Sequence, residues 1–234
     1  MNRVQPRDSA LEPCDAPPID AAFIILLDRD ERRRENAHST LSRVGYDVEI
    51  FHAVDGLSLT SADIERLIRQ GYLGADCAKR LKRGQIACAL SHIHVLEEVV
   101  TRRCRNALVF EDDFDLAEGF AKKLHDSLRV VPREFDVIYV YDANLMNSSA
   151  VAGPPGIRKS AHPLGTVGYA VSNRGARKIL DLITPITHHL DEMLAMHVDR
   201  GEIQAYSVSP SLVTFRVGFE SQVDFSGYLE CEDS

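Results

Sequence analysis

The chain has 234 residues, of which 44% are hydrophobic and 26% are charged, a composition typical of globular proteins. Its length suits one sizeable domain with a proper core, and no apolar run approaches the roughly 20 residues that a membrane-spanning helix needs. The formal net charge of −8 argues against general nucleic-acid binding, so we expect no nucleic-acid partner.

The first twenty residues hold four prolines and no apolar stretch, which predicts a flexible leader rather than a secretory signal. We expect a leader over 1–20, a single domain over 21–222 and a flexible tail over 223–234, in a cytoplasmic protein. The five cysteines include no C-x-x-C pair, which indicates neither a disulfide framework nor a zinc cluster. We interpret them as reduced thiols and expect Cys88 in the core.

Hydrophobic periodicity predicts alternating strands and helices. In the first half we expect strands at 22–27 and 47–53, a turn at 54–56, and helices at 31–44, 61–70 (capped by Ser61) and 86–103. In the second half we expect strands at 107–110, 136–141 and 166–171, helices at 116–130, 175–182 (capped by Ser172 or Asn173) and 190–198, and an extended stretch at 205–213. This alternation predicts an α/β fold with a mostly parallel sheet flanked by helices.

Three adjacent carboxylates, Glu111, Asp112 and Asp113, follow the predicted strand 107–110 directly. Ligands of open α/β sheets gather outside the carboxyl ends of strands. Three adjacent acids repel one another unless a cation or a basic partner is present, and a hard divalent cation accepts carboxylates together with phosphate oxygens and water. The triplet is therefore a candidate metal site, with a surface cluster of acids as the alternative.

Several segments accompany the triplet in a recognisable order: FIILLDR at 23–29, FHAVDG at 51–56, GQIACALSH at 84–92, LVFEDD at 108–113, GYAVS at 168–172 and SPSLV at 209–213. In this order the chain resembles family 25 glycosyltransferases, which include bacterial lipooligosaccharide galactosyltransferases and collagen galactosyltransferases. The resemblance covers roughly 22–221. It implies a GT-A-type fold with a nucleotide-binding sheet, a UDP-sugar donor (often UDP-galactose), dependence on Mn²⁺ or Mg²⁺, and inversion at the anomeric carbon.

The resemblance also implies roles for individual residues. Glu111 and Asp113 are expected to bind the metal, with Asp112 nearer the nucleotide. His92 recurs in the family motif, so we keep it as a cofactor-binding candidate; a satisfied core histidine is the alternative. The expected nucleotide-binding edge comprises Leu27, Asp28, Arg29, Ala53, Val54, Asp55 and Gly56.

An inverting transferase needs one base to deprotonate the acceptor hydroxyl, and the resemblance places Asp191 in this role or beside the donor sugar. The alternatives are a simple acid at a helix N-terminus, or Glu192 as the base. Among the basic residues near the motifs we expect only Arg29 to reach the diphosphate. The arginines of the first helix, Arg33 included, are expected on its surface.

These features predict transfer of a hexose, galactose by preference, to a saccharide or glycolipid acceptor such as lipooligosaccharide. The basic stretch 79–83 is a candidate for a peripheral contact with the inner membrane. Two departures from the family pattern, Leu26 and Gln85, leave open a non-catalytic nucleotide-sugar-binding protein. A nucleotidyltransferase is a further alternative, whereas the lack of a Gly-rich phosphate loop after the first strand argues against kinase-like and dinucleotide enzymes.

Overall fold

The computed structural model describes residues 18–77, 80–150, 156–216 and 218. The first half contains β1 (Ala21–Leu26), α1 (Glu31–Val44), β2 (Val48–His52), a 3-10 turn η1 (Gly56–Ser58), α2 (Ser61–Arg69), α3 (Arg83–Thr101), β3 (Asn106–Phe110) and β4 (Phe114–Leu116). The second half contains α4 (Phe120–Leu128), β5 (Val137–Tyr139), η2 (Leu145–Asn147), β6 (Ser149–Ala150), β7 (Ile157–Lys159), β8 (Gly168–Ser172), α5 (Asn173–Ile183), α6 (Leu190–Asp199), β9 (Ala205–Val208) and β10 (Val213–Phe215).

The main sheet has the strand order β2-β1-β3-β8-β5-β9-β7-β6. Strand β1 pairs in parallel with β2 and β3, and β5 pairs in parallel with β9. Strand β8 runs antiparallel between β3 and β5, and β7 runs antiparallel to β9 and to β6. The mostly parallel direction of the strands confirms the predicted α/β class and agrees with the GT-A-type fold that the resemblance implies.

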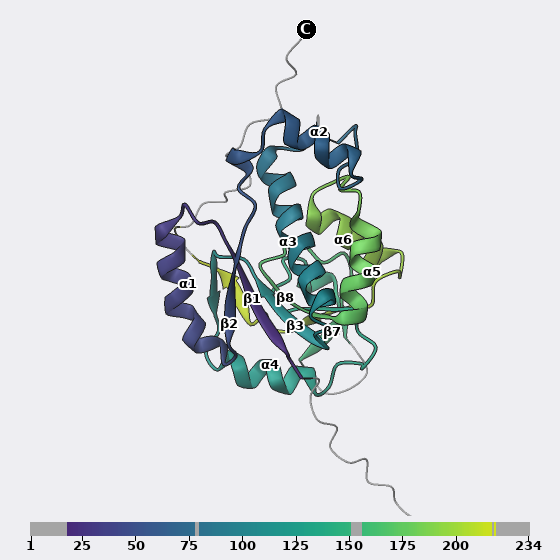
Figure 1. Cartoon of the computed structure of the whole chain (residues 1–234). Coiled ribbons are helices and arrows are strands. Elements are labelled where there is room, and N and C mark those ends of the chain that lie inside the picture. The colour runs from purple at the N-terminus through teal and green to yellow at the C-terminus, as the bar shows by residue number, and fades with distance from the viewer. Residues whose placement is uncertain (1–17, 78–79, 151–155, 217, 219–234) are drawn as a thin grey trace, which may run out of the picture.

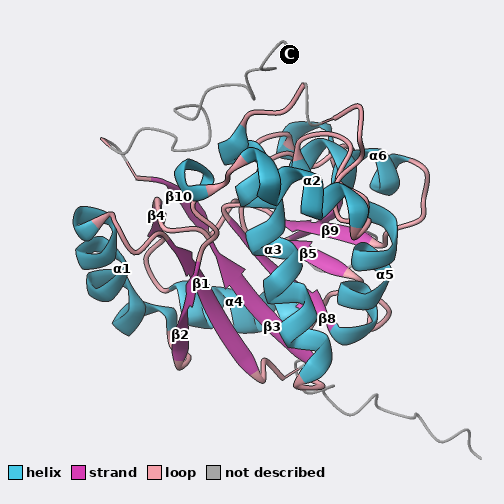
Figure 2. Cartoon of the chain, turned by 45° about the horizontal axis from the view of Figure 1, so that its top comes forward, coloured by secondary structure: helices cyan, strands magenta, loops and turns pink. Residues whose placement is uncertain are grey.

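Helices cover both faces of this sheet, with α1 and α4 on one side and α3 and α5 on the other (Figures 1 and 2). The apolar run in β1 serves both faces: Phe23 and Ile25 belong to the core beneath α3, while Ala22 and Ile24 belong to the core beneath α1 and α4. A strand buried on both faces needs such a continuous apolar run. The sheet is therefore the middle of three layers. Because helices cover both faces, a ligand site is expected at the ends of the strands or beside the outermost strands.

Local differences from the predicted elements have local causes. The helix predicted over 116–130 begins later, at Phe120, because Phe114–Leu116 forms β4 and Gly119 adopts a left-handed conformation (φ 70°) just before the helix. The extended stretch predicted over 205–213 is divided: β9 lies in the main sheet, whereas β10 pairs with β4 in a separate two-stranded sheet.

Capping residues were predicted with mixed success. The cap of α2 is Thr60 rather than Ser61, since its hydroxyl accepts the Asp63 N–H while the Asp63 carboxylate accepts the Thr60 N–H. Ser172 caps α5 as predicted, through a 3.0 Å bond from the Gly175 N–H.

The strands β6 and β7 were not predicted, because two or three residues are too few to show a period.

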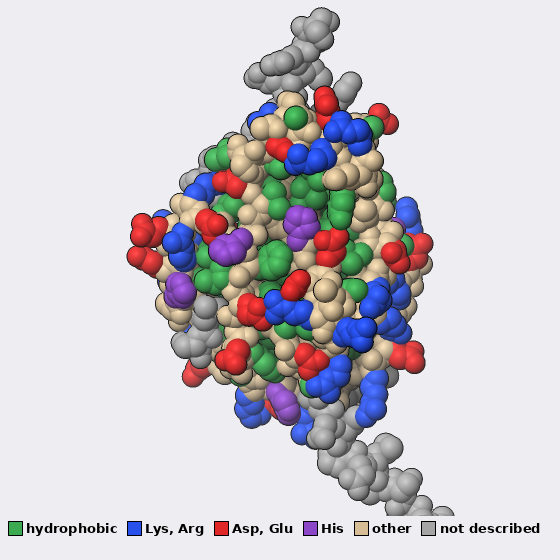
Figure 3. Space-filling model, in the orientation of Figure 1, with side chains coloured by type: hydrophobic (Ala, Val, Ile, Leu, Met, Phe, Trp, Pro, Cys, Tyr) green, Lys and Arg blue, Asp and Glu red, His purple; other side chains and the backbone are tan. Residues whose placement is uncertain are grey.

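Residues 1–17, the whole of the predicted tail and Lys79 of the basic stretch lie outside the described residues. No described helix is long and apolar enough to cross a membrane. On the face seen in Figure 3, acidic and basic side chains are interspersed.

Candidate functional site

A cavity of about 830 Å³ opens at one edge of the main sheet. Strands β2, β1 and β3 are parallel and end at this edge, so the segments that follow them meet there. The N-terminal parts of α3 and α6 supply further parts of the wall, through Gly84, Gln85 and Cys88 and through Leu190 and Asp191. The position follows the rule that ligands of α/β sheets bind outside the carboxyl ends of strands.

The antiparallel strand β8 shapes the wall next to the triplet. Because β8 runs opposite to β3, the residues before β8 lie beside the residues after β3. The Glu111 N–H donates to the Val167 carbonyl at 3.0 Å, and the Thr166 hydroxyl donates to Glu111 Oε1 at 2.5 Å. Thr166 and Val167, which are more than fifty residues away in the sequence, thus hold Glu111 at the cavity wall.

Arg33 is the basic partner of the triplet. Its side chain is only 5% exposed; one guanidinium nitrogen bonds Asp112 Oδ1 and lies 3.6 Å from Asp113 Oδ2. The expectation that Arg33 lies on the surface of its helix was therefore wrong. The Leu27 N–H also donates to the Asp112 carboxylate. The other oxygen of Asp113, Oδ1, is buried and has no hydrogen-bond partner among the described residues.

The three carboxylates differ in acidity. Burial and the charge of Glu111 together raise the pKa of Asp113 to about 7, against the smaller opposing effect of Arg33. Burial also raises the pKa of Asp112, against the opposing effect of Arg33. Burial would raise the pKa of Glu111 too, but His92, Thr166 and Arg33 together bring it below its ordinary value. The single positive charge of Arg33 therefore does not neutralise the three carboxylates of the triplet.

His92 connects the triplet to α3. It is 1% exposed, its Nδ1 lies 2.9 Å from the Tyr169 hydroxyl, and its ring stacks on Tyr169 at a centroid distance of 5.7 Å. Its Nε2 lies 3.4 Å from Glu111 Oε1 but has no hydrogen-bond partner among the described residues. His92 is therefore buried like a core histidine, yet its Nε2 faces Glu111 at the site.

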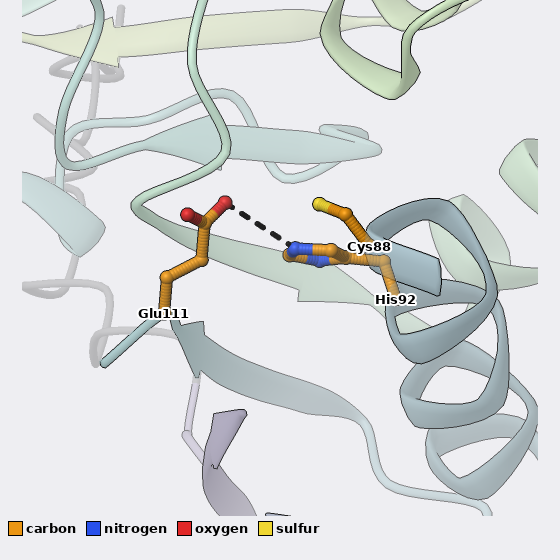
Figure 4. Close-up of side chains that lie close together, drawn as sticks. All are labelled: Cys88, His92 and Glu111. Atoms are coloured by element: carbon orange, nitrogen blue, oxygen red, sulfur yellow. Dashed lines mark ion pairs between the residues drawn. The ribbon is translucent and has the colours of Figure 1, made fainter. Parts of the chain in front are cut away.

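Cys88 is not a core residue, contrary to the expectation from the sequence. It is half-buried and lines the cavity one helical turn before His92, and both side chains project from α3 toward Glu111 (Figure 4). Burial raises the pKa of its thiol well above the ordinary value, and the charges of Glu111, Asp191 and Asp113 raise it further. The thiol is therefore protonated at neutral pH, which disfavours a role as nucleophile.

Six of the seven residues predicted for the nucleotide-binding edge line the cavity: Leu27, Arg29, Ala53, Val54, Asp55 and Gly56. The seventh, Asp28, does not; its carboxylate is 71% exposed and lies 2.6 Å from His52 Nδ1. The predicted binding roles of these residues remain predictions.

Two contacts fix the loop after β2. The Val54 N–H donates to the Ser91 hydroxyl at 2.9 Å, and Asp55 pairs with Arg29 at 2.8 Å. Gly56 lies so close to the start of α3 that a β-carbon there would come within 2.8 Å of the Gly84 backbone. This loop and the first turn of α3 are therefore positioned as one wall.

Asp191 lies in the first turn of α6 and lines the same cavity as the triplet. Its Oδ2 accepts the Gly165 N–H at 3.3 Å and its Oδ1 accepts the Glu192 N–H at 2.9 Å. Both bonds orient a carboxylate at the edge of the cavity. Glu192, the alternative base, does not line the cavity.

Sequence reasoning missed Arg33, Cys88, Thr166, Gly165 and Phe215 as residues of the cavity wall. For Arg33 a signal existed: it is one turn into the helix that follows β1, so it faces the same edge as the triplet. Gly165 and Thr166 reach the cavity because β8 is antiparallel to β3, and Phe215 reaches it through the β4–β10 pair. Cys88 reaches it because its side of α3 faces the cavity. A single sequence reveals none of these arrangements.

The carboxylate-lined cavity lies at the strand ends of an α/β sheet, where ligands of such proteins bind. The chain belongs to glycosyltransferase family 25, because the model described as "Glycosyltransferase family 25 (LPS biosynthesis protein)" matches residues 19–194. This confirms the resemblance drawn from the ordered motifs.

The relatives include proteins named galactosyltransferases and proteins named inactive. The chain is 31% identical to the human "Inactive glycosyltransferase 25 family member 3", over 83% of this chain and 36% of the relative. It is 28% identical to human "Procollagen galactosyltransferase 2" (83% and 35%) and 30% identical to "Procollagen galactosyltransferase 1-B" of Xenopus laevis (81% and 33%). The chain thus spans about a third of the length of these relatives.

Proposed function

We propose that the chain transfers a hexose, galactose by preference, from a UDP-sugar to a saccharide acceptor, with a divalent cation and with inversion at the anomeric carbon. The observation that carries the proposal is the buried triplet at the cavity wall, in which Asp113 has a pKa of about 7 and an oxygen without a hydrogen-bond partner among the described residues. Such a cluster is short of positive charge, and a divalent cation, which also binds the donor's diphosphate, supplies it.

The residues present fit a hard divalent cation. Glu111 and Asp113 would hold Mn²⁺ or Mg²⁺, since Asp112 is already bonded to Arg33. When bound, the cation stabilises the negative charge that develops on the leaving diphosphate. Arg33 holds Asp112 in place from behind, and Thr166 does the same for Glu111.

The donor would lie between the strand ends and α3. The uridine and ribose fit the wall formed by Leu27, Ala53 and Val54, where backbone groups and Asp112 can accept or donate hydrogen bonds. Gly84 and Gln85 in the first turn of α3 line the cavity, and a helix N-terminus favours phosphate. Arg29 is 42% exposed beside Asp55 at the mouth, within reach of the diphosphate if that pair opens.

Asp191 would act as the base. In a single displacement the acceptor oxygen forms a bond to the anomeric carbon while the bond from that carbon to the diphosphate oxygen breaks, and UDP leaves with the electron pair. The acceptor proton passes to a carboxylate oxygen of Asp191. The two backbone N–H groups that bond Asp191 keep its carboxylate oriented before the acceptor arrives, which is the positioning that general-base catalysis requires.

Lipooligosaccharide or another membrane-linked glycan is the acceptor that we propose, with the chain on the cytoplasmic side and in peripheral contact with the inner membrane. The support is the description of the family as a lipopolysaccharide biosynthesis protein and the basic residues near 80–83, which suit an anionic surface.

A non-catalytic nucleotide-sugar-binding protein is the second candidate, because several relatives are named inactive. The two departures from the family pattern support it less than the sequence suggested. Leu26 is 1% exposed and does not line the cavity. Gln85 lines the cavity, but its side-chain oxygen accepts the Lys82 N–H at 2.8 Å and so caps α3 without any charge.

A panel of UDP- and GDP-sugars, each with Mn²⁺ or with EDTA, separates the candidates. Thermal unfolding reports binding, and chromatography reports released nucleotide. The proposal predicts a Mn²⁺-dependent rise in melting temperature with UDP-galactose, and UDP release when saccharide acceptors are added. A Mn²⁺-dependent rise without turnover, across all acceptors, would favour the binding protein. Equal melting with every sugar would reject both, and release of pyrophosphate from a nucleoside triphosphate would indicate a nucleotidyltransferase.

A further inference from the structure

Three different metal-binding side chains converge on one wall of the cavity. The ligand atoms of Cys88, His92 and Glu111 all lie within 4.8 Å of one another (Figure 4). Cys88 and His92 are four residues apart on α3, so they share one face of that helix. Glu111 approaches from the end of β3, held by its bond from the Thr166 hydroxyl.

We propose that Cys88, His92 and Glu111 form a binding site for zinc, or for another borderline divalent cation, that is separate from the Glu111–Asp113 pair. A thiolate and an imidazole are ligands that favour Zn²⁺ over Mn²⁺ and Mg²⁺, which prefer oxygen. Three protein ligands with one open position describe a zinc ion that faces solvent or substrate, and here the open position would face the cavity.

The spacing of the ligand atoms suits a small tetrahedral ion. With metal–ligand bonds of about 2.0 to 2.3 Å, a tetrahedral zinc ion spaces its ligand atoms by roughly 3.5 Å. His92 Nε2 and Glu111 Oε1 are already 3.4 Å apart. Only the sulfur of Cys88 has to approach further, by at most about 1.3 Å, the difference between the 4.8 Å limit and the roughly 3.5 Å spacing. Rotation of one side-chain bond in a half-buried cysteine provides such a movement.

His92 is prepared for this role. Its side chain is 99% buried. Its Nε2 faces Glu111 and has no hydrogen-bond partner among the described residues. Its Nδ1 lies 2.9 Å from the Tyr169 hydroxyl. Histidine ligands of metals usually donate their second ring N–H to such a partner, which fixes the tautomer and leaves the other nitrogen free to bind the metal. Tyr169 is therefore a positioning residue for the site.

Metal binding displaces the thiol proton of Cys88, so the thiolate need not be present beforehand. The sulfur of Cys88 forms a bond to the ion, and the thiol proton leaves to solvent. The neighbouring carboxylate of Glu111 attracts the incoming cation, and a coordinating thiol loses its proton. Because Glu111 belongs to both sites, a zinc ion here competes with the Mn²⁺ or Mg²⁺ of the proposed function.

Cobalt(II) tests the site directly, because a thiolate ligand gives Co²⁺ a near-ultraviolet charge-transfer band and a tetrahedral geometry gives it intense visible bands. The full-length chain carrying Cys14→Ser and Cys231→Ser is the background, which removes the two cysteines outside the described residues. We expect one Co²⁺ per chain with both sets of bands, and displacement of Co²⁺ by Zn²⁺.

Variants separate this site from other thiols and from the carboxylate pair. Cys88→Ser should abolish the charge-transfer band and weaken Zn²⁺ binding by roughly tenfold or more, and Tyr169→Phe should weaken it by about 10- to 100-fold while keeping the band. The matched control Cys104→Ser, at a buried thiol, should leave both unchanged. Asp113→Asn should keep the band while losing Mn²⁺-dependent donor binding, so the two sites can fail independently.

The proposal is overturned if the background protein shows no charge-transfer band at saturating Co²⁺, or if the band survives in Cys88→Ser. It is also overturned if Cys88→Ala and Cys88→Ser, both shown to melt cooperatively, bind Zn²⁺ as tightly as the background.

Discussion

Asp113→Asn isolates the charge shortage of the acidic triplet. The pKa of Asp113 is about 7 in the folded protein, against an ordinary value of 3.8. Between these two values the folded chain binds a proton that the unfolded chain does not, so the free energy of unfolding falls as the pH rises through this window. At about 1.4 kcal/mol per pKa unit, full ionisation of Asp113 costs the metal-free protein about 4 kcal/mol.

An asparagine cannot ionise, so the variant escapes this cost. Its buried amide adds a cost of about 1–3 kcal/mol if it is left without partners. In EDTA at pH 8 we therefore expect the variant to be about 1–3 kcal/mol more stable than the wild type. At pH 5 this advantage disappears or reverses, since the wild type regains about 3 kcal/mol when Asp113 takes up its proton.

Urea unfolding followed by circular dichroism measures these differences, because the chain has no tryptophan to report by fluorescence. Each protein is unfolded at pH 5 and pH 8, in EDTA and in Mn²⁺. Mn²⁺ should stabilise the wild type at pH 8 and the variant much less. A difference between the two proteins that does not change from pH 5 to pH 8 in EDTA would refute the reasoning, because it would mean that Asp113 is ordinarily acidic.

Other residues of the site give further predictions. Arg33→Met leaves buried carboxylates such as Asp112 without their partner, so urea unfolding should show a loss of about 3–5 kcal/mol that Mn²⁺ partly restores; a loss below 1 kcal/mol would contradict the buried pair. Asp191→Ala should lower kcat by about 10²- to 10⁴-fold with unchanged donor affinity by calorimetry, whereas normal turnover would show that Asp191 is not the base. Gly56→Ala places a β-carbon within 2.8 Å of the Gly84 backbone, so we expect a loss of about 1–3 kcal/mol and weaker donor binding, and unchanged affinity would show that this loop does not shape the cavity.

The order and type of the long elements could be predicted from the sequence because each carries its own period. The apolar run of β1 and the 19 residues of α3 are examples. Parallel pairing of β1, β2 and β3 then places their following segments at one edge, which is why the triplet and most of the predicted nucleotide-binding edge line one cavity. Local signals were enough for this part of the site.

The remaining residues depend on contacts that no local pattern encodes. Arg33 was assigned to the surface because its neighbours Arg32 and Arg34 make the start of α1 look uniformly polar. Cys88 was assigned to the core because its helix is apolar on average, although its side of α3 lines the cavity together with His92. Thr166 reaches Glu111 only because β8 is antiparallel to β3, and strand direction cannot be read from strand composition.

The central claim is that Glu111-Asp112-Asp113 binds the diphosphate of a UDP-sugar through a divalent cation. The most direct measurement is chromatographic quantification of UDP released from UDP-galactose by the wild type and by Asp113→Ala, with a saccharide acceptor and either Mn²⁺ or EDTA. The account predicts release only by the wild type with Mn²⁺. Equal release in EDTA, or by Asp113→Ala, would contradict it.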